Sequence, residues 1–469
     1  MSTPMQGNDS DASMRRPDDA PARPTLVEVF RFWLKLGFIS FGGPAGQIAM
    51  MHQELVERRR WISEQRFLHA LNYCMLLPGP EAQQLATYIG WLLHRTWGGL
   101  IAGGLFILPS LLLLVALSWI YIAFGDLAVV SGVLYGIKPA VTAIVVFAAW
   151  RIGSRTLKNG YLMAIAAAAF IAIFVFGLPF PAIVIAAAVL GFLGGRLRPA
   201  AFAPGGGHAA AGKSYGRAVI DDDTPTPAHA LFTWARLSRV LVVGGLLWGA
   251  SLGVLLLQFG WEGTLTQMGW FFTKAALLTF GGAYAVLPYV YQGAVVHFEW
   301  LTATQMIDGL ALGETTPGPL IIVVAFVGFI GGWTHQIFGP DALFLSGAVA
   351  AVVVTWFTFL PSFVFILGGG PLVESTHGNL NFTAPLTGIT ASVVGVILNL
   401  ALFFAWHVLW PTASAAAPFS GTFEWAALAI GVAAFIALFR YKADVMRVLA
   451  GCGLAGLGWT FLQPMLAAG

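Results

Sequence analysis

Long apolar stretches without a charged side chain restrict what this chain can fold into more than any other feature. Residues 111–124, 141–150 and 161–176 are examples. Many apolar stretches approach or exceed the roughly 20 residues that a membrane-spanning helix needs, and they lack the alternating polarity of barrel strands. Only 10% of the residues are charged, against roughly 25% in a soluble domain. The sequence therefore predicts an all-α polytopic membrane protein.

The chain contains two copies of one motif pattern. A shift of 239 residues superimposes, without a gap, Lys35 on Lys274, Phe41-Gly42-Gly43 on Phe280-Gly281-Gly282, Gln53 on Gln292, Trp61 on Trp300 and Pro78-Gly79-Pro80 on Pro317-Gly318-Pro319. Further along, the shift becomes 252 and places Leu108-Pro109-Ser110 on Leu360-Pro361-Ser362 and Gly136 on Gly388. Several matches in one register indicate an internal duplication.

The duplication divides the chain into five parts. We expect a disordered cytoplasmic tail at 1–24, a first membrane repeat at 25–195, a cytoplasmic linker at 196–239, a connecting transmembrane helix at 240–260 and a second membrane repeat at 261–469. The linker is rich in Gly, Ala and Pro, which is typical of a flexible segment. Because the connecting helix has no counterpart before the first repeat, it reverses the second copy and predicts inverted-topology repeats.

The positive charges test this topology independently. We place the N-terminus in the cytoplasm, let nine apolar segments cross the membrane, and let the four motif segments enter and leave on one side as re-entrant broken helices. Of the 24 Lys and Arg residues, 20 then fall on the cytoplasmic side, and the other four, Arg31, Lys35, Lys138 and Lys274, lie within membrane segments. The positive-inside rule predicts such a bias. A pair of full crossings in place of each re-entrant segment fits equally well.

Both motifs interrupt helices at membrane depth. The Phe-Gly-Gly motifs hold paired Gly residues, and Pro-Gly-Pro cannot continue a helix. Backbone freed in this way must be buried in protein or line a wet cavity. A helix that restarts after a break presents unpaired N–H groups and a positive dipole end, which suit an anion. The alternatives are close helix packing at the Gly pairs and a plain sharp turn at Pro-Gly-Pro.

Three Lys residues within apolar segments are further candidates for binding an anion. Lys35 and Lys274 each lie six residues before a Phe-Gly-Gly motif, and Lys138 precedes Pro139 in mid-segment. A Lys inside a membrane is costly and is a functional candidate by default. The alternatives are that these side chains reach the membrane surface or pair with a carboxylate.

The residues that flank Pro-Gly-Pro differ between the two copies. Thr315 and Thr316 precede the second motif, and their hydroxyl groups can donate hydrogen bonds to an oxyanion. Glu81 follows the first motif and Glu314 precedes the second. Either carboxylate can bind a proton and so couple transport to pH, or pair with a buried Lys.

Other site types have little support in the sequence. The nine His residues show no metal-ligand spacing, so we expect neither a metal nor a cofactor. We find no nucleophile–base pair, metal cluster or redox Cys of the kind that an enzyme would need, and we predict no nucleic-acid partner. Four glycines near the C-terminus suggest close helix packing, namely Gly451, Gly453, Gly456 and Gly458. A homodimer interface is one form that this packing could take.

In their order and spacing, the motifs resemble the chromate ion transporter family in its long-chain, two-domain form. The first half is similar to that family's N-terminal domain through Phe41-Gly42-Gly43-Pro44, Gln53, Glu54, Trp61, Phe67 and Pro78-Gly79-Pro80. The second half is similar to its second domain through Phe280-Gly281-Gly282, Trp300 and Pro317-Gly318-Pro319. The resemblance implies efflux of chromate across the bacterial inner (plasma) membrane, chromate resistance, and sulfate as an analogue and competitor.

The residues by themselves leave other functions open. A secondary transporter that exports a dianion fits, because a dianion that leaves a negative interior gains roughly 4.6 kcal/mol per 100 mV. An importer or exchanger of sulfate or another oxyanion, or an anion channel, would use the same scaffold. In each case membrane lipid surrounds the protein.

Overall fold

The protein is helical throughout the part that the structure describes. The computed structural model describes residues 21–202, 215–225, 227–280, 282–376, 383–413 and 417–467. Most of the predicted tail 1–24 and Gly281 of the second Phe-Gly-Gly motif lie outside these ranges. Within them there is no strand, although Ile62 and Ile220 form an isolated β-bridge. The prediction of an all-α protein is confirmed.

The helices of the first half are broken at the predicted motifs. In chain order they are α1 (Leu26–Ile39), α2 (Gly43–His52), the π-helical turn η1 (Gln53–Arg58), α3 (Glu64–Leu76), α4 (Glu81–Phe124), α5 (Ala128–Thr156), α6 (Gly160–Phe174), α7 (Phe180–Leu197) and α8 (Pro199–Phe202). The Phe-Gly-Gly motif separates α1 from α2, and Pro-Gly-Pro separates α3 from α4. Pro80 is the residue just before α4.

After the short turn η2 (Ala228–Ala230), the second half repeats this order. It contains the connecting helix α9 (Trp234–Phe259), then α10 (Thr264–Leu278), α11 (Ala283–Tyr291), the π-helical turn η3 (Gln292–His297), α12 (Ala303–Thr315), η4 (Leu320–Ile322), α13 (Val323–Thr334), η5 (Pro340–Ala342), α14 (Leu343–Thr376), α15 (Thr383–Leu409), α16 (Trp425–Phe439) and α17 (Val445–Ala467). Even irregular features recur at the shift of 239, such as the positive φ of Arg60 (51°) and Glu299 (52°). The orientation of the repeats relative to a membrane stays a prediction.

The nine segments predicted to cross the membrane are all helical. They correspond to α4–α7, α9 and α14–α17. Seven helices in the described part of the chain are long and apolar enough to span a bilayer. The other two predicted crossings, α6 and α16, have 15 residues each. A helix of that length extends about 22 Å, which is less than the roughly 30 Å of a hydrocarbon core.

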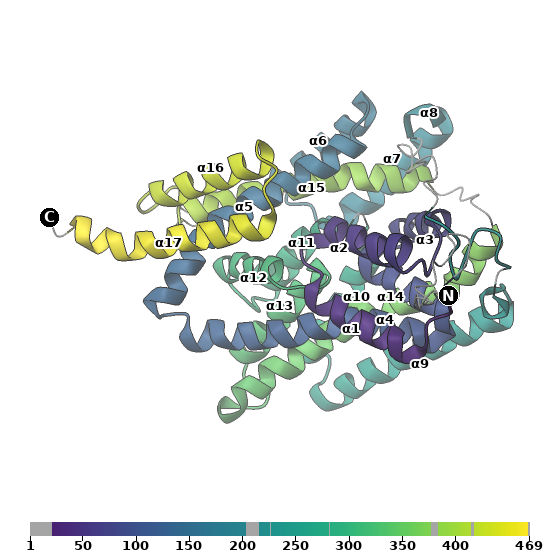
Figure 1. Cartoon of the computed structure of the whole chain (residues 1–469). Coiled ribbons are helices and arrows are strands. Elements are labelled where there is room, and N and C mark those ends of the chain that lie inside the picture. The colour runs from purple at the N-terminus through teal and green to yellow at the C-terminus, as the bar shows by residue number, and fades with distance from the viewer. Residues whose placement is uncertain are drawn as a thin grey trace, which may run out of the picture.

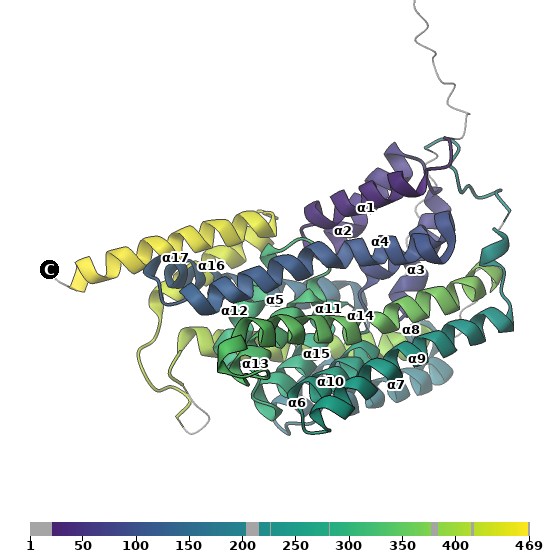
Figure 2. The ribbon, with the colours of Figure 1, turned by 90° about the horizontal axis from the view of Figure 1, so that it is seen from below.

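The helices gather into two bundles, each built from both halves of the chain. Helices α5–α7 pack with α15–α17 in what we term the α5 bundle, and α1, α4, α9, α10, α13 and α14 form the α4 bundle. In Figure 1 the α5 bundle occupies the upper part of the molecule, and Figure 2 shows α9 and α13 of the α4 bundle in front. Helices α2, α3, α11 and α12 lie between them. The corresponding helices α5 and α15 run in opposite directions in Figure 1.

Glycine allows the closest approaches inside the α5 bundle. A Cβ atom added to Gly136 on α5 would lie 1.9 Å from the carbonyl oxygen of Cys452 on α17. At the equivalent contact, a Cβ on Gly388 of α15 would lie 2.4 Å from the carbonyl oxygen of Ala187 on α7. Gly456 contacts Gly136 within this chain, whereas nothing lies within 4 Å of a Cβ added to Gly451 or Gly458. A homodimer seam at these residues stays a prediction.

Part of the linker is fixed to the first repeat, which its glycine-rich composition did not predict. The backbone N–H groups of Val219 and Ile220 donate to the carbonyl oxygens of Arg60 and Trp61 at 2.9 and 3.1 Å, and that of Ser63 donates back to Ile220 at 2.9 Å. These bonds form because the loop before α3 exposes an extended edge. Segment 215–225 is therefore bound at the surface of the first repeat.

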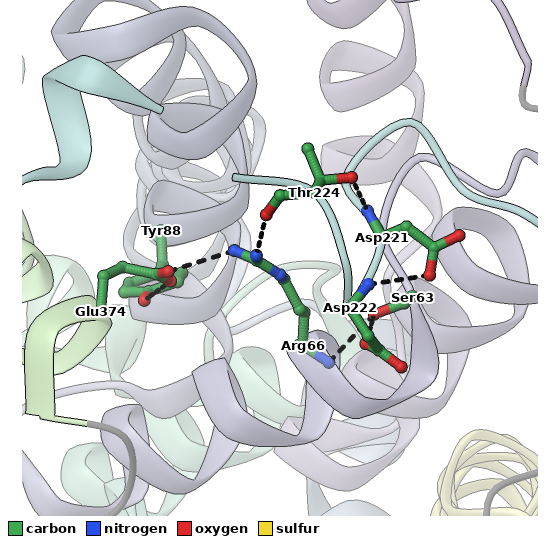
Figure 3. Close-up of polar contacts among 7 residues, drawn as sticks. All are labelled: Ser63, Arg66, Tyr88, Asp221, Asp222, Thr224 and Glu374. Atoms are coloured by element: carbon green, nitrogen blue, oxygen red, sulfur yellow. Dashed lines mark hydrogen bonds and ion pairs between the residues drawn. The ribbon is translucent and has the colours of Figure 1, made fainter. Parts of the chain in front are cut away.

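A buried ion pair links this docked linker to the end of α14. Arg66 on α3 lies 3.2 Å from the carboxylate of Glu374, and it also donates to the carbonyl oxygen of Thr224 at 2.5 Å. The hydroxyl group of Tyr88 on α4 donates to the same carboxylate at 2.5 Å (Figure 3). The cluster joins α3, α4, α14 and the linker at one end of the molecule.

Candidate functional site

The breaks of the two repeats meet, and each Pro-Gly-Pro turn bonds to the residue that precedes the other repeat's Phe-Gly-Gly motif. The backbone N–H of Gly79 donates to the carbonyl oxygen of Thr279 at 2.7 Å. The N–H of Gly318 donates to the carbonyl oxygen of Ser40 at 2.9 Å. When each residue is replaced by its counterpart at the shift of 239, each of these two bonds becomes the other. Reciprocal contacts of this kind are what an approximate two-fold axis between the repeats generates.

Serine side chains from the middle of two long helices lie against these turns. The hydroxyl of Ser110 on α4 donates to the carbonyl oxygen of Pro317 at 2.5 Å. Its counterpart at the shift of 252, Ser362 on α14, accepts a hydrogen bond of 3.4 Å from the amide of Gln84. That amide also donates to the carbonyl oxygen of Pro78 at 2.8 Å. The carbonyl groups of Pro78 and Pro317 are thus satisfied within the protein, as the membrane interior demands.

A cavity of about 1040 Å³ lies beside these breaks. Helices α2 and α3 line one side of it and α5 lines the other. Its lining includes Ala49, Met75 and Arg155, which are exposed, so the cavity is open to the surface. Residues of both Phe-Gly-Gly motifs, Gly42, Gly43 and Gly282, also line it. The cavity therefore brings together the glycine breaks of the two repeats.

Two helices begin at the cavity without a side-chain cap. Helix α2 starts after Gly42 and α11 starts after Gly282, and neither glycine can cap the first turn through a side chain. The first turn of each helix lines the cavity through Ala45 and Tyr284 among others. The first N–H groups of a helix lack partners within the helix and carry a partial positive charge. Both helix starts are suited to bind an anion in the cavity.

Two predicted carboxylates face the same cavity. Glu81 begins α4, and its Oε1 atom lies 3.9 Å from where a Cβ of Gly282 would stand. Glu314, near the end of α12, is buried and accepts a short hydrogen bond from the hydroxyl of Tyr284. An ionised carboxylate beside a dianion is repelled by it, so both groups favour an anion only when protonated.

Positive charge reaches the cavity from α5, which carries no part of either motif. Arg151 is half-buried in the cavity lining, and Arg155 follows one turn later with an exposed side chain. Arg151 and Tyr284 line the same cavity. Residues four apart share one helix face. Both guanidinium groups are therefore available to bind an oxyanion, and guanidinium suits it through paired hydrogen bonds.

The three predicted Lys residues do not line this cavity. Lys35 and Lys274 are exposed on α1 and α10, and the ammonium group of Lys274 lies 5.7 Å from the ring centroid of Trp270. Lys138 forms an ion pair of 3.4 Å with Asp308 on α12, whose other oxygen accepts from Tyr121 at 2.9 Å. A carboxylate partner for a buried Lys was one of the predicted alternatives.

Other predicted site residues surround the cavity without lining it. The hydroxyl groups of Thr315 and Thr316 donate to carbonyl oxygens of their own helix, at Leu312 and Gly313. The Pro-Gly-Pro turns hold the helix breaks beside the cavity in place through the hydrogen bonds described above. Phe41 and Phe280 are half-buried beside the helix breaks. The roles of all these residues in binding stay predictions.

Comparisons with known proteins place the chain in a family. The model of the family described as "Chromate transporter" matches residues 27–192 and 266–457. The chain belongs to the chromate transporter family. The "Chromate transport protein" of Pseudomonas aeruginosa is 33% identical over 93% of this chain and 93% of its own length. That of Cupriavidus metallidurans is 28% identical over 92% of this chain and 93% of its own length.

A shorter relative matches only part of this chromate transporter chain. The "Uncharacterized transporter YwrA" of Bacillus subtilis is 29% identical over 28% of this chain, which corresponds to 74% of that protein. No solved structure matches the chain. The family assignment makes this chain a membrane transporter and not an enzyme.

The sequence reasoning missed the Arg residues of the chromate transporter's cavity and the partner of Lys138. Arg151 and Arg155 lie at the end of an apolar segment, where their charges were read only as topological signals. A usable signal was present, because two Arg residues four apart share one face of a helix. Asp308 gave a weaker signal, a lone acid within an apolar segment.

Proposed function

We propose that this chain exports chromate from the bacterial cytoplasm and so confers chromate resistance. The observation that carries the proposal is the open cavity, in which two uncapped helix starts and Arg151 converge. Partial positive charge from backbone N–H groups and a full charge from a guanidinium group suit a tetrahedral dianion. Sulfate has the same shape and charge, so we expect it to compete for the site. Family membership supports chromate as the transported ion.

The proposed direction follows from charge and membrane potential. We place the protein in the inner membrane with the N-terminus in the cytoplasm and the repeats inverted, which leaves no Lys or Arg in an outside loop. The cavity mouth then faces the cytoplasm, because it lies at the end of α5 that carries Arg155. A dianion leaving through 100 mV gains roughly 4.6 kcal/mol, which corresponds to a gradient on the order of a thousandfold.

Two of the four glutamates that line the cavity suggest how transport is coupled to protons; the other two, Glu57 and Glu64, both contact His52. Glu81 and Glu314 stand beside the proposed anion site, and Tyr284 donates a hydrogen bond to Glu314. Two ionised carboxylates would repel a dianion in a space from which water is partly excluded. We therefore propose that the anion binds when these groups are protonated.

Transport in sealed vesicles tests the direction of flux. Everted vesicles that contain the protein should accumulate labelled chromate under an inside-positive potential, which matches the native direction, and right-side-out vesicles under their native inside-negative potential should not. Unlabelled sulfate in excess should reduce the accumulation. If everted vesicles accumulate sulfate but not chromate, the chain is a sulfate transporter and the proposed substrate is wrong. Steady single-channel currents would instead identify an anion channel.

A further inference from the structure

In the described part of the second repeat, the space equivalent to the cavity is occupied by packed helices. In the first repeat, α2 and α3 stand across the cavity from α5. Their counterparts in the second repeat, α11 and α12, pack directly against α15, the counterpart of α5. The two repeats therefore share their order of elements but differ in the space between them. One is open and the other is closed.

The residues that fill the closed space are the counterparts of residues that line the open one. The shifts of 239 and 252 place His52 on Tyr291, Arg151 on Phe403 and Arg155 on His407. The ring centroids of Tyr291 and Phe403 lie 4.4 Å apart, and those of Phe403 and His407 lie 3.9 Å apart. This aromatic stack joins α11 to α15 at the position where the first repeat has its cavity.

Residues that line the open cavity are also more exposed than their counterparts in the second repeat. Ala49, which is exposed at the open cavity, corresponds at the shift of 239 to Pro288, which is buried. Ile152, half-buried in the cavity wall, corresponds to Phe404, which is fully buried. A rotation of α11 and α12 away from α15 would expose a surface equivalent to the present cavity. If the repeats are inverted, that surface would open on the other side of the membrane.

Lys138 belongs to this closed counterpart. Its equivalent at the shift of 252 is Thr390, which lines the open cavity. Lys138 therefore takes the place in the closed space that Thr390 takes in the open one. The side chain of its partner Asp308 is 2% exposed, whereas the side chain of Lys138 is 26% exposed. Asp308 thus holds a cation that a second ligand can still approach.

We infer that the second repeat contains the closed counterpart of the anion cavity, sealed by the Tyr291–Phe403–His407 stack, and that Lys138 binds the oxyanion when this counterpart opens on the opposite side of the membrane. The inference rests on the transport function proposed above and extends it to a second state. In that state the ammonium group of Lys138 leaves the carboxylate of Asp308 and binds the anion. Because two Arg residues face the present cavity and aromatic residues replace them in the counterpart, the anion is bound less tightly there, which favours its release.

The first experiment follows thiol accessibility and needs no substrate. In a Cys74→Ala/Cys452→Ala background, Ile152→Cys reports on the open cavity. Leu400→Cys reports on the closed one, because Leu400 is 2% exposed and lies one helical turn before Phe404, the counterpart of Ile152. A membrane-impermeant maleimide should label Ile152→Cys from one side of sealed vesicles and leave Leu400→Cys unlabelled. Only variants that elute as the parent protein does in size-exclusion chromatography are compared.

Crosslinking then traps each state. A short bis-maleimide should link the His52→Cys/Arg151→Cys pair, closing the present cavity, and Leu400→Cys should then react from the side opposite to that of Ile152→Cys. The matched pair Tyr291→Cys/Phe403→Cys should trap the present state and keep Leu400→Cys unreactive. Labelling of Leu400→Cys from the same side as Ile152→Cys, or no labelling in either crosslinked form, would overturn the inference.

A second experiment separates binding by Lys138 from a structural ion pair. The double variant Lys138→Gln/Asp308→Asn removes both charges, so no buried charge is left unpaired. The half-saturating chromate concentration should rise about ten- to a hundredfold from the side on which Leu400→Cys reacts, and should not change from the cavity side. An equal rise in the half-saturating concentration on both sides would reject binding by Lys138. If thiol accessibility switches sides but chromate is not transported, the proposed substrate fails and the second state stands.

Discussion

The backbone N–H of Gly318 donates to the carbonyl oxygen of Ser40, so the turn of one repeat is held by the helix break of the other. The reciprocal bond from Gly79 to Thr279 completes the pair. Both bonds lie beside the cavity that we propose to hold the anion. The geometry of that site therefore depends on contacts between the repeats.

Substitution of the turn glycines should disrupt the fold around the site. Gly79 and Gly318 have φ values of 127° and 93°, where a side chain adds about 1–3 kcal/mol of strain. A Cβ at Gly318 would also lie 1.8 Å from the hydroxyl oxygen of Ser110, and one at Gly79 would lie 2.5 Å from that of Ser362. We expect Gly318→Ala to lower the melting temperature of the purified protein more than Gly79→Ala does.

Gly104→Ala is the matched control for these two variants. Gly104 lies within α4, and nothing stands within 4 Å of an added Cβ. Because Ala favours a helix over Gly by about 1 kcal/mol, its melting temperature should be unchanged or slightly raised. Equal stability of Gly104→Ala and Gly318→Ala would show that the turns tolerate a side chain.

Arg151→Gln should weaken chromate binding more than loss of any predicted Lys residue. Arg151 lines the cavity, whereas Lys35 and Lys274 are exposed outside it. A charge-assisted hydrogen bond contributes about 1.5–3 kcal/mol, so the dissociation constant should rise about ten- to a hundredfold. Binding of labelled chromate to purified protein measures it. Lys35→Ala and Lys274→Ala each remove one positive charge and serve as controls, and a larger effect in either of them would move the site out of this cavity.

Glu81 and Glu314, two of the four glutamates that line the cavity, should make anion binding pH-dependent. Glu81 and Glu314 repel an anion when ionised and do not when protonated, so affinity should fall as pH rises through their titration. Glu81→Gln and Glu314→Gln copy the protonated form and should flatten this dependence. Sulfate is the better probe here, because its own charge does not change over the range. A pH dependence that survives in the double Gln variant would assign the titration to other groups.

The cluster at the end of α14 should contribute strongly to stability. Glu374→Ala would leave the guanidinium of Arg66, which is 16% exposed, without its carboxylate, at a cost of about 3–5 kcal/mol. Tyr88→Phe removes one hydrogen bond to the same group and should cost about 1 kcal/mol. Thermal unfolding should therefore rank Glu374→Ala well below Tyr88→Phe. The double variant Arg66→Met/Glu374→Met should recover much of the loss, since neither charge then remains.

Local chemistry explains why the helix breaks could be predicted from the sequence. Gly and Pro act on their own backbone, so Phe41-Gly42-Gly43 and Pro78-Gly79-Pro80 mark the ends of α1 and α3 whatever surrounds them. The duplication could be detected for the same reason, because equal residues at equal spacing need no three-dimensional information. The family resemblance rests on these same local motifs.

The side chains that complete the site depend on packing between distant helices. Arg151 is more than 100 residues from the first Phe-Gly-Gly motif, and only the arrangement of the two bundles brings it to Tyr284. The pairing of Lys138 with Asp308 joins α5 to α12, which a count of charges along the chain does not reveal. The docking of residues 215–225 likewise depends on an exposed backbone edge that composition does not encode.

The reciprocal bonds between the turns also limit what half of this molecule can do. Expressed alone, the first repeat would keep the Ser40 carbonyl and the Gly79 N–H, but both groups would lose their partners at membrane depth. Such groups cost several kcal/mol each in lipid. Each half should therefore be an incomplete molecule that recovers function by complementation, either with the other half supplied from a second gene or with a second copy inserted in the opposite sense.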